Sequence, residues 1–66
     1  MNYEELNRVI DVSGLKRSHI AQKLGMKDPA FCKRTTGAVE WKVGEVAELV
    51  KILGISKTKA YDIFLA

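Results

Sequence analysis

The chain has very few of the residues that build disulfides, metal centres and catalytic sites. Its one cysteine, Cys32, excludes an intramolecular disulfide, and with the one histidine, His19, it leaves too few ligands for a zinc site. A Ser/His/Asp set, a Gly-rich phosphate loop and an obvious pair of carboxylates are also missing. We therefore expect no catalytic residues, no metal, no cofactor and no small-molecule ligand, and so not an enzyme.

Long apolar runs are missing as well. No run approaches the roughly 18 residues of a membrane span, and the N-terminal MNYEELNR carries acids where a signal peptide is apolar. The hydrophobic content of 47% is nevertheless that of a globular chain. These features predict one small domain over residues 1–66, without a membrane partner, in the cytoplasm.

The periodic pattern that is present is helical. Apolar residues recur at spacings of three and four, which predicts an all-α, compact five-helix domain. We place the helices at about residues 2–13, 17–24, 28–36, 43–53 and 57–65, with stops at Gly14, Gly25, Gly37 and Gly54. In the last two helices the residues expected to face the core are Val43, Val46, Ala47, Val50, Leu53, Tyr61, Phe64 and Leu65.

The helix starts differ in their capping residues. Asp28 is expected to cap the third helix, with Pro29 at its first helical position, and Ser56 to cap the fifth. Lys16 stands where the second helix needs a capping side chain. A cation there opposes the helix dipole, so an external anion is favoured at this helix start.

Residues 17–34 have the spacing of a helix-turn-helix. Ala21 lies where a second helix can cross closely, and Gly25 lies where the chain must turn sharply. Apolar anchors for the two helices are Ile20, Leu24, Met26 and Phe31. Two short helices joined by such a turn form the unit that places its second helix in the DNA major groove.

Positive charge is concentrated in the same stretch. Residues 15–34 contain six cations and one acid, a charge of +5, whereas the rest of the chain has five cations and seven acids, a charge of −2. The net charge of +3 therefore conceals a basic segment on a weakly acidic body. A solvated basic face would look the same by charge alone, but charge together with helix spacing favours a nucleic-acid partner.

The strongest signature is the block IAQKLGM at residues 20–26, accompanied by Leu15, Phe31, Gly37 and the block LGIS at residues 53–56. With it the chain resembles the lambda-repressor-like, Cro/repressor-type DNA-binding domains over nearly its full length. The resemblance implies a helix-turn-helix at the second and third helices. It also implies a sequence-specific double-stranded DNA-binding transcriptional regulator, similar to a small phage or prophage Cro-type repressor associated with the bacterial nucleoid.

Mapping the family's interface onto this sequence gives two sets of candidate DNA contacts. The residues expected to read bases are Asp28, Pro29, Ala30, Cys32, Lys33 and Thr36. The residues expected to bind phosphate are Lys16, Arg17, Ser18, Lys27, Arg34 and Lys42. Lys33 is the strongest base-reading candidate because a lysine can donate to guanine O6 or N7.

Several of these residues have a second interpretation. Asp28 either accepts from a base or only caps its helix. Lys33 either reads a base, contacts a phosphate or is solvated. Cys32 is either a redox-sensitive contact or a small, partly buried apolar residue, and the second is favoured. Arg34 either packs on Trp41 and reaches a phosphate or is solvated.

One such domain touches few base pairs, so a weak homodimer on a pseudo-palindromic operator is expected. The candidate dimer residues are Val39, Trp41, Tyr61, Phe64 and Leu65, although the same side chains would also serve to close the monomer core.

Two other functions fit the sequence less well. One is a DNA-binding antitoxin, and the other is a protein-interaction module on a helix-turn-helix scaffold.

Overall fold

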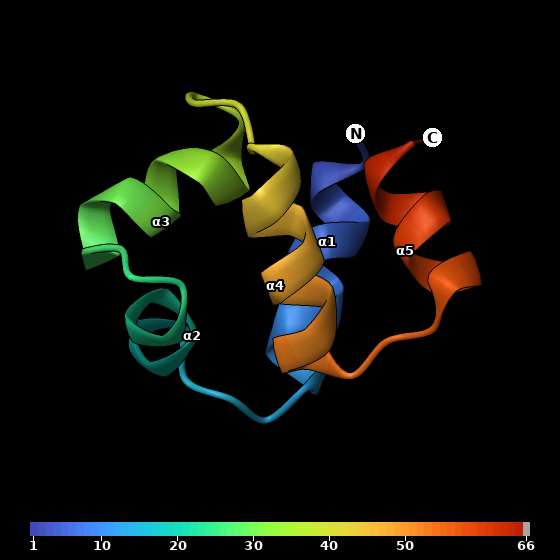
Figure 1. The fold of residues 1–66 in the computed structure, drawn as a ribbon, viewed down its shortest axis with the longest axis horizontal. Helices are drawn as coiled ribbons and strands as arrows, with labels where there is room; N and C mark the ends of the chain where they lie inside the picture. The colour runs from blue at the N-terminus through green and yellow to red at the C-terminus, as the bar shows by residue number, and fades with distance from the viewer. Residues whose placement is uncertain (66) are drawn as a thin grey trace.

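The computed structural model describes residues 1–65, which contain five α-helices and no β-strand. The helices are α1 (Tyr3–Val12), α2 (Arg17–Lys23), α3 (Asp28–Thr36), α4 (Val43–Leu53) and α5 (Lys57–Phe64), as Figure 1 shows. The all-helical prediction is confirmed, and every helix begins and ends within one residue of its predicted place.

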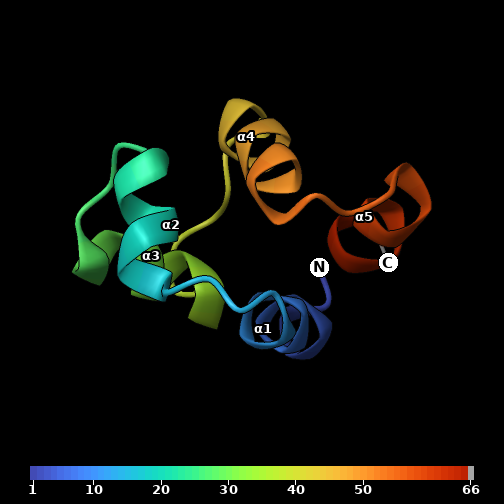
Figure 2. The same ribbon diagram turned by 90° about the horizontal axis from the view of Figure 1, so that it is seen from below.

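The helices are arranged with α2 and α3 at one end of the molecule and α5 at the other. Both views show α1 and α4 between these ends, and the start of the chain lies beside α5 (Figures 1 and 2). The backbone N–H of Asn2 donates to the carbonyl of Ile63 at 2.7 Å, which joins the start of α1 to α5. The α2–α3 pair packs against the rest of the fold through contacts of α3 with α1 and of α2 with α4.

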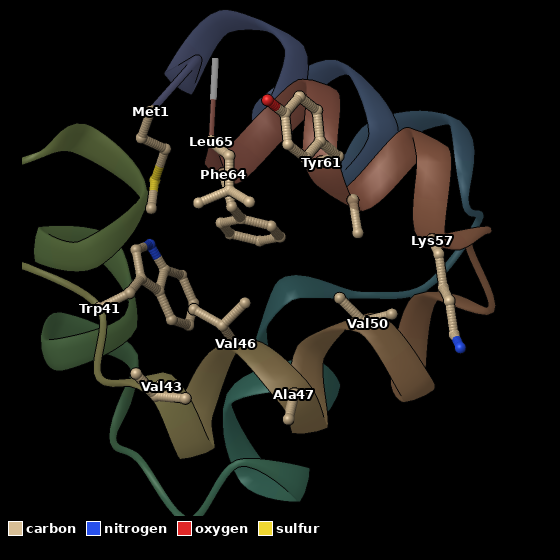
Figure 3. Close-up of a pocket in the computed structure, with 11 residues that line it drawn as sticks. Met1, Trp41, Val43, Val46, Ala47, Val50, Lys57, Tyr61, Phe64 and Leu65 are labelled. Carbon is tan, nitrogen blue, oxygen red and sulfur yellow. The ribbon is translucent and has the colours of Figure 1, made fainter.

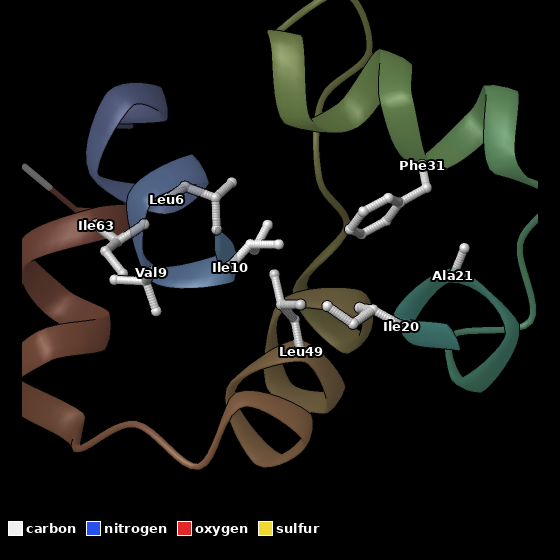
Figure 4. Close-up of a cluster of buried hydrophobic side chains, with 8 residues drawn as sticks. All are labelled: Leu6, Val9, Ile10, Ile20, Ala21, Phe31, Leu49 and Ile63. Atoms are coloured by element: carbon white, nitrogen blue, oxygen red, sulfur yellow. The ribbon is translucent and has the colours of Figure 1, made fainter. Parts of the chain in front are cut away.

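A single hydrophobic core draws on all five helices. Its members are Leu6, Val9 and Ile10 of α1, Ile20 and Ala21 of α2, Phe31 of α3, Leu49 of α4 and Ile63 of α5 (Figure 4). Ala21 is fully buried, as its place at the predicted helix crossing requires. A buried polar side chain, Thr35, joins them on α3, and its hydroxyl donates to the carbonyl of Cys32 at 3.0 Å.

The predicted core face of α4 is wrong. Leu49 is the fully buried residue of this helix, whereas Val43 is 89% exposed and Ala47 is also exposed. Leu53, which was expected inside, does pack against the core. Apolar residues cover a sector of α4 wider than one buried stripe, so its spacing is compatible with more than one buried stripe. Packing selects the stripe that contains Leu49.

The predicted core face of α5 is wrong for a similar reason. Ile63 is fully buried, while Tyr61 is 60% exposed and Leu65, the residue that ends the helix, is 70% exposed. Phe64 is half-buried and packs against the core. The prediction therefore holds for Phe64, whereas Tyr61 and Leu65 face away from the core and Ile63 takes their place.

The capping predictions have mixed outcomes. The Ser56 hydroxyl accepts the N–H of Lys59 at 3.1 Å, and Lys16 gives α2 no capping side chain, as expected. The prediction that Asp28 caps α3 is wrong because Lys27 holds the N-cap position and Asp28 is already the first helical residue.

A glycine follows each helix of the α2–α3 unit. Gly25 follows α2 with φ of +72°, and Gly37 ends α3 with φ of +89°. Glycine alone adopts this left-handed backbone without steric cost. At Gly37 a β-carbon would also lie 3.0 Å from the ring of Tyr3, so the Tyr3 side chain would have to shift to make room for one.

Candidate nucleic-acid interface

The turn between α2 and α3 is held by backbone hydrogen bonds. The N–H of Gly25 donates to the carbonyl of Gln22 at 3.1 Å, and that of Met26 donates to the carbonyl of Ala21 at 2.9 Å. These bonds satisfy carbonyls that the end of a helix leaves free. The two helices also share the buried core cluster, which includes Ile20 and Ala21 of α2 and Phe31 of α3. The two helices are therefore fixed relative to each other.

Four lysines of this unit are exposed: Lys16, Lys23, Lys27 and Lys33. None of them forms an ion pair with an acid among residues 1–65. Lys42, at the start of α4, is likewise exposed and unpaired in the described chain. These five ammonium groups are available to an anion from outside the molecule.

Arg17 is used differently. Its Nη1 donates to Asn7 Oδ1 and its Nη2 donates to Asp11 Oδ1, both at 2.9 Å. The guanidinium thus bridges two acceptors that lie one turn apart on α1. Its side chain is still 41% exposed, so a phosphate can reach it, but Asp11 already neutralises part of its charge.

Arg34 is turned into the protein. Its Nε lies 3.0 Å from Glu45 Oε1, its Nη1 donates to the carbonyl of Ala30 at 3.3 Å, and its side chain is only 15% exposed. Partial burial raises the pKa of Glu45, but hydrogen bonds from the Lys42 backbone N–H and the Arg34 guanidinium outweigh it and lower the pKa. The Arg34 charge is paired with Glu45 across the α3–α4 contact. Because the guanidinium is paired and mostly buried, this geometry does not favour the predicted phosphate contact.

The outer side of α3 exposes most of the predicted base-reading residues. Asp28, Pro29, Cys32, Lys33 and Thr36 are exposed, whereas Ala30 is half-buried beside Arg34. The expectation that Cys32 is partly buried is wrong, because its position on α3 faces away from the core. Thr36 donates its hydroxyl to the backbone carbonyl of Lys33 at 3.2 Å, and the exposed Lys33 ammonium forms no ion pair among residues 1–65.

A small cleft of about 210 Å³ opens between the start of α2 and the side of α3. Its lining residues are Arg17, Ser18, Asp28, Phe31, Cys32 and Thr35. The cleft joins candidates of both sets, since Arg17 and Ser18 were expected to bind phosphate and Asp28 and Cys32 to read bases. Its polar groups include a cation, a carboxylate, a thiol and a hydroxyl.

The candidate dimer residues gather elsewhere, at an apolar groove of about 600 Å³ between α4 and α5. Figure 3 shows side chains from both helices facing it, with Lys57 at one end as the charged side chain among the described lining residues. Trp41, Tyr61, Phe64 and Leu65 line it as a group, whereas Val39 does not. The sequence interpretation missed five further apolar members of α4 and α5: it had assigned Val43, Val46, Ala47 and Val50 to the core, and it gave no role to Ala60.

Trp41 connects this groove to the core. Its ring makes edge-to-face contacts with Phe31 and Phe64, with ring centroids 6.2 and 6.5 Å apart. Its Nε1 donates to the carbonyl of Arg34 at 3.0 Å, so its polar atom is satisfied inside the protein. The expected role of Trp41 as a lid on the core therefore fits its contacts, and one side of the ring still borders the groove.

Residues 1–65 contain no group of three His, Cys, Asp or Glu side chains suited to a metal ion. None of the described helices is long and apolar enough to cross a bilayer. Comparison of the chain with family models, curated proteins and solved structures finds no match.

Proposed function

We propose that this protein is a sequence-specific, double-stranded DNA-binding transcriptional regulator of the Cro-repressor kind, with α2 and α3 as its helix-turn-helix. The observation that carries the proposal is the set of four exposed, unpaired lysines on a rigid two-helix unit. Unpaired cations on a fixed scaffold favour phosphate binding because each contact releases counterions from the nucleic acid.

The dimensions of α3 suit a major groove. An α-helix with its side chains is about 10–12 Å in diameter, which fits a groove about 12 Å wide, and the nine residues of α3 give about 13 Å of helix to lie in it. Lys33 would donate to guanine O6 or N7, while Pro29 offers an apolar contact to a thymine methyl. Lys16 and Ser18 at the start of α2, with Lys27 in the turn, would bind the phosphates on either side.

We further propose that a second copy of the chain covers the α4–α5 groove. Both helices present apolar side chains to it at spacings of three and four, and the groove includes Val43, Tyr61 and Leu65, all more than half exposed. An apolar patch of this kind is typical of an interface, and a two-fold axis would place the same patch on both partners. Two copies are also what a pseudo-palindromic operator needs.

Selection from a pool of random duplexes tests the proposal. We expect enrichment of an inverted repeat with half-sites about one helical turn apart, and affinity that falls steeply as salt rises. A footprint with two protected half-sites on one face of the duplex would support a repressor that blocks polymerase by occupying its operator. Failure to bind any duplex at low salt would overturn the proposal.

The alternative of a protein-interaction module is favoured by one observation, the groove itself, since an amphipathic helix of another protein would fit the same apolar trough. The two functions are separated by the variant Lys33→Ala. A DNA-binding regulator loses operator affinity in this variant, whereas a module that works through α4 and α5 keeps its binding.

A further inference from the structure

The first residue of α2, Arg17, is tied to α1 by two bonds of different character. Asn7 is half-buried, and its Nδ2 donates to the carbonyls of Tyr3 at 2.8 Å and Thr35 at 3.0 Å while its Oδ1 accepts from Arg17. Its three bonds link α1, α2 and the end of α3. The Asn7 side of the bridge is therefore fixed by the fold.

The other side of the bridge is loose. The Asp11 side chain is 67% exposed, and its bond to Arg17 is the one side-chain hydrogen bond it makes within residues 1–65. An ion pair this open to water is worth only about 0.2–1 kcal/mol and weakens in salt. A DNA phosphate that neighbouring cations such as Lys16 hold near the start of α2 can displace it.

The surroundings of Arg17 show where such an anion would arrive. The side chain lines the cleft between α2 and α3, next to Ser18, and Lys16 precedes it. A guanidinium has five N–H groups, and the two bonds to α1 leave the others available to another acceptor. Asp28 also lines this cleft, so an approaching anion meets a carboxylate there as well as the Arg17 guanidinium.

We infer that Asp11 belongs to the DNA interface as a competitor of the DNA phosphate for Arg17. In the free protein Asp11 neutralises Arg17, and on binding a phosphate oxygen takes its place. The inference rests on the proposed DNA-binding function. It assigns α1 a part in setting affinity that neither charge pattern nor helix spacing indicates.

Asp11→Asn tests the inference, with Asp62→Asn as its matched control. Both variants remove one exposed carboxylate, but Asp62 lies on α5 at the other end of the molecule (Figure 1). Binding of each variant to a fluorescent random-sequence duplex is measured by anisotropy at rising salt. We expect Asp11→Asn to bind about two- to fivefold more tightly at low salt, with a smaller gain at high salt, and Asp62→Asn to change little.

The dependence on Arg17 separates competition from a simple change of net charge. In an Arg17→Ala background, Asp11→Asn should gain no more than Asp62→Asn does. Arg17→Gln serves as a second background if Arg17→Ala melts at a lower temperature than the parent, because a glutamine amide can still donate to Asn7 but carries no charge for which Asp11 and a phosphate would compete.

Each outcome decides a different point. Equal gains for Asp11→Asn and Asp62→Asn, or a gain that persists without Arg17, overturn the inference and leave DNA binding intact. A parent protein that binds no duplex at low salt overturns both the inference and the proposed function.

Discussion

The two ends of this molecule expose opposite kinds of side chain. At the α2–α3 end the apolar residues are buried and lysines are left outside without partners. At the α4–α5 groove the charges are few and valine, tyrosine and leucine side chains stay exposed. The difference shows that a chain of this size buries one core only. The side chains left exposed are charged at one end of the molecule and apolar at the other.

The largest effect expected is at the helix crossing that holds the α2–α3 end together. Ala21→Glu places a carboxylate in a fully buried position and should cost about 3–5 kcal/mol of unfolding free energy, enough to unfold a small domain. Circular dichroism during urea or heat denaturation measures it. Gln22→Glu, on the exposed side of the same helix, is the control and should change stability by less than about 0.5 kcal/mol. An Ala21→Glu variant that melts like the parent would disprove the crossing.

A second prediction concerns DNA binding by the exposed lysines at the α2–α3 end. Lys33→Ala should cost about 1–3 kcal/mol of binding free energy on the selected operator and less on random duplex. Lys51→Ala on α4, where the lysine lies 3.8 Å from Glu48, is the matched control and should have little effect. Equal losses on both DNAs would make Lys33 a phosphate contact.

A third prediction concerns the apolar end. Leu65→Lys should shift the monomer–dimer equilibrium about tenfold toward monomer, roughly 1.4 kcal/mol, because it brings a charge to an apolar interface. Val12→Lys is the control, since Val12 is equally exposed, at 70%, but lies on α1 outside the groove. Sedimentation at several concentrations measures both. If the parent is monomeric throughout and binds its operator as one copy, the second-copy proposal fails.

The smallest effect concerns the ion pairs of Glu5 with Arg8 and Lys59, the second of which joins α1 to α5. Bonds from Arg8 and Lys59 lower the pKa of Glu5 from 4.5 to about 2. A carboxyl with a lowered folded-state pKa stabilises the fold above its unfolded pKa, and this stabilisation disappears as pH falls from about 4.5 through about 2. Glu5→Gln should therefore be less stable than the parent at pH 6, and the difference should vanish near pH 2.

Melting temperatures across this pH range measure the Glu5 effect. Glu4→Gln is the control, because Glu4 is exposed and forms no ion pair among the described residues. A constant difference between Glu5→Gln and the parent at all pH values would show that the ion pairs of Glu5 do not stabilise the fold.

Much of the candidate interface was predictable because it depends on neighbours in the chain. Gly25 between two short apolar patterns predicted the turn, and the spacing of Ala21 predicted the crossing. The pairing of Arg17 with Asp11 and of Arg34 with Glu45 was not predictable, since each partner comes from another helix. The count of six cations in residues 15–34 therefore overstates the charge that this end presents, because only four of them are unpaired lysines.

The sequence by itself determined where the helices lie and where they stop, because capping groups, glycine conformations and the 3.6-residue repeat act within a few residues. Only the tertiary structure decided which face of α4 and α5 is buried. Val43, Val46 and Val50 are as apolar as Leu49, and a repeat along one helix cannot say which of two apolar stripes meets another helix. That choice depends on how α1 and α2 fill the space around Leu49, and it left the other stripe to form the groove.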